Sequence, residues 1–194
     1  MTKESTGRLC VRVAARQEEA TDIVSFELVP CEGESLPAFA AGAHIDVHVG
    51  DGLVRQYSLC NDPCETHRYL IAVLKEPSSR GGSRAMHETI KVGDVLSISE
   101  PKNHFPVEAG ARRHLLLAGG IGVTPILCMA QALAVQGADF EMHFCTRSAD
   151  RTAFRERIAR SRFAGRVQFH HDDGAQEQRF DIGRRLASVQ PGEH

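Results

Sequence analysis

The sequence predicts an antiparallel β-barrel domain followed by a partial, doubly wound α/β domain. Short strands separated by glycine and proline fill the first half of the chain, which is typical of a barrel. In the second half, strands alternate with helices, which is typical of a parallel sheet. The change falls near Pro101, Pro106 and Gly110. We therefore expect one domain over residues 1–103 and another over residues 111–194.

Six strands are expected in the barrel, and the clearest covers residues 44–49. Polar and apolar side chains alternate there, and glycines at positions 50 and 52 supply a turn. A short helix over residues 82–90 would close one end of the barrel. The other strands are expected at residues 9–13, 23–29, 54–59, 68–74 and 95–99.

The second half opens on an apolar run at residues 114–118, which predicts a buried parallel strand. After three glycines, Thr124 is expected to cap a helix that begins at Pro125 and ends before Gly137. Further strands are expected at residues 140–146 and 166–170, and further helices after Ser148 or Asp150 and after Asp181.

The composition is that of an ordinary folded protein, with 194 residues of which 42% are hydrophobic and 25% charged. The 23 basic and 25 acidic residues give a net charge of −2, which argues against general nucleic-acid binding. No apolar run approaches the ~20 residues that span a bilayer, and the first seven residues hold no signal core. We therefore expect a cytoplasmic protein without membrane contacts.

Neither cysteine nor histidine spacing indicates a metal site. Among six cysteines, Cys60 and Cys64 form the only pair that is close in the sequence, which falls short of zinc and iron–sulfur spacings, so reduced thiols are expected. His170 and His171 are adjacent on a predicted strand and would face opposite sides, so they would not easily chelate one ion.

Two segments of the first half carry residue types suited to a phosphorylated ligand. Arg55 offers a planar fork for a phosphate, Tyr57 an aromatic ring and Ser58 a hydroxyl, although an ordinary strand with a solvated arginine has the same pattern. Residues 81–83 (Gly-Gly-Ser) offer backbone amides and a hydroxyl to an anion, or form a plain surface turn.

A third segment, residues 119–125, follows the buried strand and opens a helix, which is where a dinucleotide pyrophosphate binds in doubly wound folds. Pro125 stands where the usual fingerprint has its third glycine. A tight strand–helix turn is the alternative, but three glycines cost chain entropy, and this cost favours a ligand site. The second domain is therefore predicted to bind a nucleotide.

These three motifs, in this order, resemble those of the ferredoxin–NADP reductase superfamily. Residues 55–62 (RQYSLCND) and 80–83 (RGGS) resemble the phthalate dioxygenase reductase family, which includes vanillate demethylase reductases. The resemblance covers residues 9–194. It implies a reductase that passes electrons from NADH through FMN to an iron–sulfur centre, with a Rieske-type aromatic-ring oxygenase or a ferredoxin as the acceptor.

For the barrel, the resemblance implies an FMN site with the phosphate at one end and the isoalloxazine ring at the other. Ser58 would lie near N5 of the ring. The positions implied are Arg55, Gly81, Gly82 and Ser83 at the phosphate, Tyr57 and Ser58 at the ring, and Ala72, Val73 and Lys75 along its pyrimidine edge.

For the second domain, the resemblance implies an NADH site. Gly120, Gly122 and Thr124 would lie at the pyrophosphate and nicotinamide, and Arg147 and Ser148 at the adenosine ribose. An arginine there favours NADP in doubly wound folds, whereas the family favours NADH, and we adopt NADH. Hydride would pass from nicotinamide C4 to flavin N5 without a general base, so no catalytic acid or base is assigned.

The sequence departs from this family after residues 191–194. Family members continue into a strand with a Cys-Gly-Pro motif and then an iron–sulfur domain, so the ligands of a [2Fe–2S] cluster would belong only to a longer chain. In a 3-2-1-4 strand order, the strand at residues 114–118 would lack its outer neighbour. We expect the natural protein to be longer, or this chain to be a truncated gene product.

Three alternatives stay open. The fold could serve a binding or regulatory domain without flavin, an FAD-dependent reductase of the same superfamily that serves a flavohaemoglobin or ferredoxin, or a stand-alone reductase of free flavin. The colour of the purified protein and the identity of any released cofactor separate these alternatives.

Overall fold

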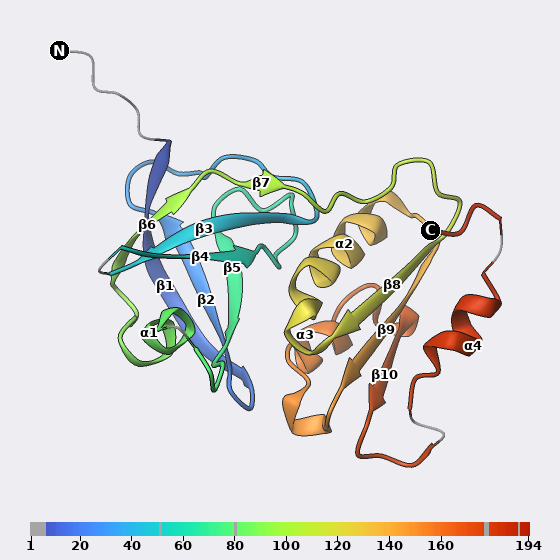
Figure 1. Cartoon of the computed structure of the whole chain (residues 1–194). Coiled ribbons are helices and arrows are strands. Elements are labelled where there is room, and N and C mark those ends of the chain that lie inside the picture. The colour runs from blue at the N-terminus through green and yellow to red at the C-terminus, as the bar shows by residue number, and fades with distance from the viewer. Residues whose placement is uncertain (1–6, 51, 80, 177–178, 190) are drawn as a thin grey trace.

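The computed structural model describes residues 7–50, 52–79, 81–176, 179–189 and 191–194 (Figure 1). Asp51 of the predicted turn and Arg80 of the RGGS motif lie outside the described residues. An antiparallel sheet from the first half and a parallel sheet from the second lie side by side, with helix α2 (Val123–Gln136) between them. This arrangement confirms the predicted fold class.

The first sheet contains β1 (Arg8–Ala20), β2 (Ile23–Pro30), β3 (Ala43–Val49), β4 (Leu53–Ser58), β5 (Tyr69–Leu74), β6 (Val95–Ser99) and β7 (Lys102–Asn103). Its strand order is β4-β3-β6-β1-β2-β5, with β7 also paired to β3. The two end strands, β4 and β5, contact each other, so the sheet wraps into a barrel. Helix α1 (Gly82–Glu88) lies against it, two residues shorter than predicted.

Strand β1 is longer than the predicted strand at residues 9–13. Its polar second half continues to Ala20 and pairs with β2, with Gln17 opposite Ser25 and Glu18 opposite Val24. Backbone pairing across the hairpin, rather than an apolar face, holds this stretch extended, so hydrophobic alternation could not reveal it.

The parallel sheet has the order β10-β9-β8, as predicted for the first three strands of a doubly wound unit. Its elements are β8 (His114–Gly119), η1 (Gly120–Gly122), α2, β9 (Phe140–Thr146), η2 (Ala149–Arg151), α3 (Arg155–Ala159), η3 (Ala164–Arg166), β10 (Val167–His171) and α4 (Ile182–Ala187).

The predicted cap of α2 is wrong, whereas that of α4 is present. Helix α2 begins at Val123, and the Thr124 hydroxyl donates a hydrogen bond to the Ile121 carbonyl at 3.1 Å. Thr124 is thus inside the first turn, because the 3₁₀ turn η1 leads directly into the helix. At α4, Oδ1 of Asp181 accepts a hydrogen bond from the Arg184 N–H at 2.9 Å.

The outer edge of β8 is partly paired. The His194 N–H donates to the Arg113 carbonyl at 2.9 Å, and the Leu115 N–H donates to the His194 carbonyl at 2.8 Å. Arg113 and Glu193 form a parallel bridge. The prediction that this strand lacks an outer neighbour is therefore wrong at its beginning, where the last residues lie in the position of a fourth strand.

The two halves of the molecule share a hydrophobic core. One cluster fills the barrel, and a second joins the parallel sheet and α2 to the outer face of the barrel. In this second cluster, Leu70 and Ala72 of β5 pack with Leu127 and Ala130 of α2. Burial of these side chains fixes the parallel sheet against β5.

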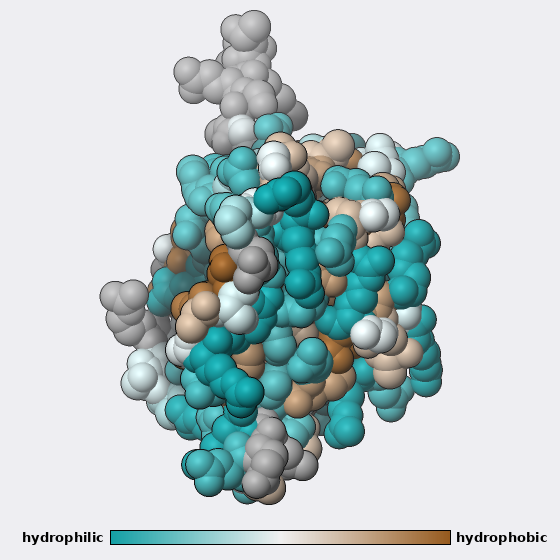
Figure 2. Space-filling view, turned by 90° about the vertical axis from the view of Figure 1, so that its right-hand side faces the viewer, coloured by the Kyte–Doolittle hydropathy of each residue, from teal (hydrophilic) through white to brown (hydrophobic). Residues whose placement is uncertain are grey.

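The opposite side of the molecule, which carries β10 and α4, is mostly hydrophilic (Figure 2). Hydrophobic residues form small patches there, and Ile182 and Leu186 of α4 are both about half exposed. In the described part of the chain, no helix combines the length and the apolar character needed to cross a membrane.

A carboxylate on β9 ties α4 to the parallel sheet and predicts an acid-sensitive stability. Glu141 accepts hydrogen bonds from Arg185 at 2.5 Å and from Arg113 at 2.7 Å. Burial opposes its ionisation, but hydrogen bonds from Arg185 and His143 outweigh burial and hold the pKa of Glu141 below its ordinary 4.5. A carboxyl whose pKa is lower in the folded state stabilises the fold above the unfolded pKa and loses this contribution as pH falls through the folded pKa.

We therefore expect the free energy of unfolding to decrease below about pH 4.5, and Glu141→Gln to weaken that decrease. Urea unfolding at neutral pH and at about pH 4 measures both effects. An equal pH dependence in the two proteins would contradict this role of Glu141.

Candidate functional site

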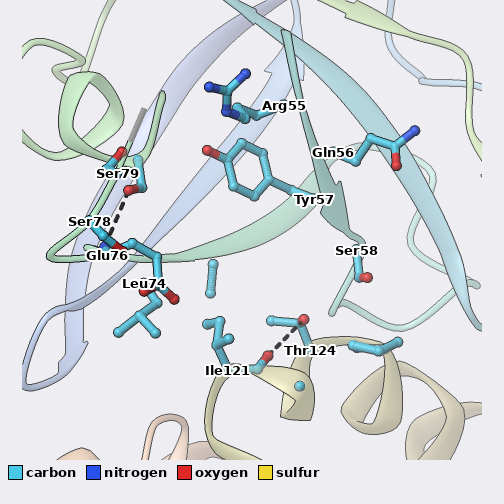
Figure 3. Close-up of a pocket in the computed structure, with 14 residues that line it drawn as sticks. Arg55, Gln56, Tyr57, Ser58, Leu74, Glu76, Ser78, Ser79, Ile121 and Thr124 are labelled. Atoms are coloured by element: carbon cyan, nitrogen blue, oxygen red, sulfur yellow. Dashed lines mark hydrogen bonds between the residues drawn. The ribbon is translucent and has the colours of Figure 1, made fainter. Parts of the chain in front are cut away.

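A cavity of about 580 Å³ lies where the end strands of the barrel face the beginning of α2 (Figure 3). It therefore opens at the seam between β4 and β5, which η1 (Gly120–Gly122) and the first turn of α2 partly cover. The residues that line it are Arg55, Gln56, Tyr57, Ser58, Ala72, Leu74, Glu76, Ser78, Ser79, Ser83, Ile121, Gly122, Thr124 and Pro125.

Strand β4 supplies four successive residues to the cavity because β4 ends the sheet. Gln56 and Tyr57 point to opposite sides of the strand (Figure 3), as the alternation of a strand predicts. The Tyr57 ring extends across the cavity toward the side that carries Ser79. Residues from both faces of β4 can thus contact one ligand that wraps around this edge.

The Tyr57 hydroxyl is buried and has no hydrogen-bond partner among the described residues. Burial raises the pKa of Tyr57 to about 12, so its hydroxyl stays protonated at neutral pH. A buried polar atom without a partner costs about 1–3 kcal/mol, and such atoms are rare in folded proteins. Tyr57 thus places an unpaired hydroxyl donor in the wall of the cavity.

Arg55 lies against the beginning of α1 because residue 82 is glycine. A Cβ atom on Gly82 would lie 2.5 Å from Nε and 2.6 Å from Cγ of Arg55. Gly81 precedes it with φ +94°, a conformation that favours glycine. Ser83 lines the cavity, and its Oγ accepts a hydrogen bond from the Glu76 N–H at 3.2 Å. These contacts bring a guanidinium, a glycine turn and a hydroxyl to one end of the cavity.

Strand β5 contributes alternate residues. Ala72 and Leu74 line the cavity, whereas Val73 points into the barrel and is only 1% exposed. The Val73 carbonyl lies 2.8 Å from Nε2 of His87, which must carry the proton because a carbonyl only accepts. The Lys75 ammonium pairs with Glu88 at 3.0 Å. The structure therefore does not place the Val73 side chain or the Lys75 ammonium where a ring in this cavity could contact them.

The second domain contributes η1 and the first turn of α2. Gly122 and Thr124 line the cavity together with Ile121 and Pro125, whereas Gly120, with φ +49°, forms the turn outside this lining. The glycine segment thus brings the backbone of the second domain close to the seam of the barrel.

Arg147 and Ser148 lie outside the cavity, after the end of β9. Gly119 of β8 pairs with Cys145 of β9, so Arg147 and Ser148, which follow β9, lie at the same edge of the parallel sheet as η1. Arg147 is exposed. The Ser148 hydroxyl donates to Oδ1 of Asp150 at 2.5 Å, and Oδ2 of the same carboxylate accepts from Thr21 Oγ1 at 2.8 Å. These hydrogen bonds hold the pKa of Asp150 below its ordinary value.

The structure therefore gathers about half of the predicted site residues in one cavity. Those that line it are Arg55, Tyr57, Ser58, Ala72, Ser83, Gly122 and Thr124; those outside the lining are Val73, Lys75, Gly81, Gly82, Gly120, Arg147 and Ser148. Sequence analysis did not assign Leu74, Glu76 or Ser78. For Leu74 the signal was present, because strand alternation places it on the face of Ala72.

Among the described residues, no cluster of three or more histidine, cysteine or acidic side chains could hold a metal ion. His170 Nε2 lies 3.0 Å from Nδ1 of His143, whereas His171 Nδ1 lies 3.0 Å from the Thr146 hydroxyl. The two adjacent histidines thus have different partners, in keeping with their predicted opposite orientations.

No protein-family model matches the chain, but curated proteins and solved structures do. It is 58% identical over 182 residues to vanillate O-demethylase oxidoreductase of Pseudomonas putida, covering 94% of this chain and 57% of that protein. It is 38% identical over 194 residues to phthalate dioxygenase reductase of Burkholderia cepacia, covering 100% of this chain and 60% of that protein.

Among solved structures, it resembles one described as phthalate dioxygenase reductase, a modular structure for electron transfer from pyridine nucleotides to [2Fe–2S]. The TM-score is 0.91 at 38% identity, and the match covers 100% of this chain and 61% of that one. A flavohaem-like FAD/NAD-binding domain of nitric oxide dioxygenase from Vibrio cholerae shares the fold, with a TM-score of 0.80 at 24% identity over 94% of this chain and 82% of that one.

A barrel packed on a parallel α/β sheet, with a cavity at their junction, is the architecture of the ferredoxin–NADP reductase superfamily. Over the length that it shares with these relatives, the chain belongs to the phthalate dioxygenase reductase branch, which includes the vanillate demethylase reductases. The chain spans about three fifths of the length of these relatives.

Proposed function

We propose that the chain is the FMN- and NADH-binding part of a reductase that passes electrons to an iron–sulfur centre and then to a Rieske-type oxygenase or demethylase. The observation that carries this proposal is the cavity in which the buried Tyr57 hydroxyl and Arg55 of the barrel meet Thr124 of the second domain. The names of the relatives, vanillate O-demethylase oxidoreductase and phthalate dioxygenase reductase, support the same reading.

In this proposal, Arg55 and the turn at residues 81–83 hold the phosphate of FMN. The guanidinium supplies charge and paired donors, while the N–H groups of the glycine turn and the Ser83 hydroxyl supply further bonds. The absence of a side chain at Gly82 supports this role, because a Cβ there would displace Arg55. A terminal phosphate fits a cradle at the end of the cavity, which favours FMN over FAD.

Tyr57, Ser58 and Ala72 would border the isoalloxazine ring. Tyr57 offers an aromatic ring and a protonated hydroxyl, and Ser58 offers a second hydroxyl on the other face of β4. Ala72, with its small side chain, leaves room at β5. For Val73 and Lys75, only backbone atoms remain candidates for contact with the ring, since their side chains point elsewhere.

Gly122 and Thr124 would receive the nicotinamide end of NADH, with Ile121 and Pro125 excluding water at the junction. Gly120 permits the turn before them. When bound, FMN would accept hydride from NADH and release electrons one at a time. The residues of the chain bind and orient the two rings, and no side chain is required to transfer a proton.

Arg147 and Ser148 would contact the adenosine ribose at the edge of the parallel sheet. The Asp150 carboxylate, bonded to the Ser148 hydroxyl, supports NADH over NADPH because a negative charge repels a 2′-phosphate. The [2Fe–2S] ligands would belong to a longer chain. The acceptor oxygenase or ferredoxin would be a cytoplasmic partner, since NADH is supplied there.

This function predicts that the purified chain retains FMN and that NADH bleaches the flavin absorbance under argon, faster than NADPH does. A colourless protein that takes up no FMN would contradict the proposal and favour a flavin-free domain. Release of FAD on heating would favour the FAD-dependent alternative, and turnover that requires a large excess of free flavin would favour flavin as a substrate.

A further inference from the structure

Cys10 and Cys31 lie opposite each other on the barrel, although 21 positions separate them in the sequence. The ladder between β1 and β2 ends at Val11 and Pro30, so Cys10 and Cys31 stand opposite each other one position beyond its last pair. The Cys31 N–H donates to the Cys10 carbonyl at 3.1 Å, which is one of the two bonds that a directly opposed, hydrogen-bonded pair exchanges. Neither residue lines the cavity.

The geometry of such a pair suits a disulfide. Opposed residues of this type have Cα atoms ~5.5 Å apart and side chains on one face of the sheet. Disulfides join Cα atoms about 4.4–6.8 Å apart, most often near 5.5–6 Å. Val11 and Val13 are fully buried in the barrel, so Cys10 points outward, and both cysteines are exposed.

We propose that Cys10 and Cys31 are an oxidant-sensitive dithiol that closes to a disulfide on exposure to hydrogen peroxide. One thiolate attacks the peroxide O–O bond, which gives a sulfenic acid and one water after proton uptake. The other thiolate then attacks that sulfur, an S–S bond forms, and hydroxide leaves as a second water. Two thiols are oxidised to one disulfide, and one peroxide is reduced to two waters.

Burial, the hydrogen bond between the two thiols and the neighbouring charges set the pH dependence of the pair. Burial and a hydrogen bond with Cys10 raise the pKa of Cys31 to about 11, whereas Arg12 on the same outward face acts to lower it and Glu32 to raise it. Since the thiolate is the reactive form, closure is expected to become faster as pH rises above neutrality.

The disulfide would close a loop that consists of the β1–β2 hairpin. The tip of this hairpin contacts the second domain, where the Thr21 N–H donates to the Asp150 carbonyl at 2.9 Å. The cross-link joins positions that already pair in the fold, so it restricts mainly the unfolded chain. We therefore expect the oxidised protein to melt a few degrees higher than the reduced protein, by the usual relation between stability and Tm.

The full chain is treated with hydrogen peroxide, and its free thiols are alkylated under denaturing conditions before mass spectrometry. We expect an intact mass about 2 Da lower before alkylation, a fall from six alkylated cysteines to four after it, and proteolytic peptides with Cys10 and Cys31 joined. Cys10→Ser and Cys31→Ser should each abolish the loss of two alkylated cysteines within one chain and the rise in Tm. Cys64→Ser, which removes another exposed cysteine, should retain both effects.

An intramolecular disulfide that persists in Cys10→Ser would overturn the proposal. The proposal would also be overturned if peroxide converted the cysteines of the wild-type protein only to sulfinic acid or only to disulfides between two chains. Because all three positions are exposed, each serine variant is expected to fold, and circular dichroism verifies this before oxidation.

Discussion

Replacing Arg55 by leucine is expected to weaken FMN binding about 100-fold while leaving the affinity for riboflavin nearly unchanged. Loss of one partner from a charge-assisted hydrogen bond costs about 2–5 kcal/mol, and each 1.4 kcal/mol corresponds to about tenfold in Kd. Riboflavin has the ring and ribityl chain of FMN but no phosphate, so it does not use the guanidinium. Fluorescence quenching on titration with each flavin measures both affinities.

Two further variants sharpen this test. In Gly82→Ala, the new Cβ would meet Arg55 at 2.5 Å and displace the side chain, so FMN affinity should fall while riboflavin affinity stays the same. Arg12→Leu removes an exposed arginine of β1 outside the cavity and should change neither affinity. If Arg55→Leu weakened FMN and riboflavin equally, the phosphate assignment would be wrong.

Replacing Gly42 by alanine is expected to destabilise the protein by about 3 kcal/mol or more. A Cβ on Gly42 would lie 1.8 Å from the backbone oxygen of Phe105, which cannot move without shifting the segment between the two domains. Gly42 also has φ +93°, which adds backbone strain when an alanine takes its place. Asn103 ties this segment to the barrel through a 2.9 Å hydrogen bond to the Ala41 carbonyl.

Gly93→Ala provides a matched control. Gly93 has φ +96°, yet a Cβ there meets no described atom within 4 Å. Gly93→Ala should therefore lower the free energy of unfolding by only about 1 kcal/mol, through backbone strain. Urea unfolding of the two variants separates strain from overlap, and an equal loss in both would show that the close approach of Phe105 is not important.

The period of the hydrophobic pattern was sufficient to predict an antiparallel sheet in the first half and a parallel sheet in the second, whereas the strand order of the barrel was not predicted. Strict alternation in β3 identifies a barrel strand with one face in the core, and the apolar run of β8 identifies a strand of the parallel sheet. The second half of β1 was not predicted as a strand because pairing with β2 holds it extended, and no local sequence pattern encodes that pairing. The cap of α2 was misplaced because η1 and α2 are continuous, so Thr124 is not the boundary residue.

The lining of the cavity was predictable where one motif supplies several of its residues, as with Arg55, Tyr57 and Ser58. Motif reasoning could not foresee that Val73 turns into the barrel, although strand alternation relative to Ala72 contained that information. The opposed pair of Cys10 and Cys31 was hidden because the two lie on different strands, whereas the sequence drew attention to Cys60 and Cys64. Of these two, Cys60 is buried and Cys64 exposed.

A crystal structure of the chain soaked with FMN tests the central claim most directly. Difference density is expected in the cavity between β4, β5 and η1, with the ring against Tyr57 and the phosphate beside Arg55 and Ser83. An empty cavity at saturating FMN, or FMN bound with its phosphate far from Arg55, would contradict it.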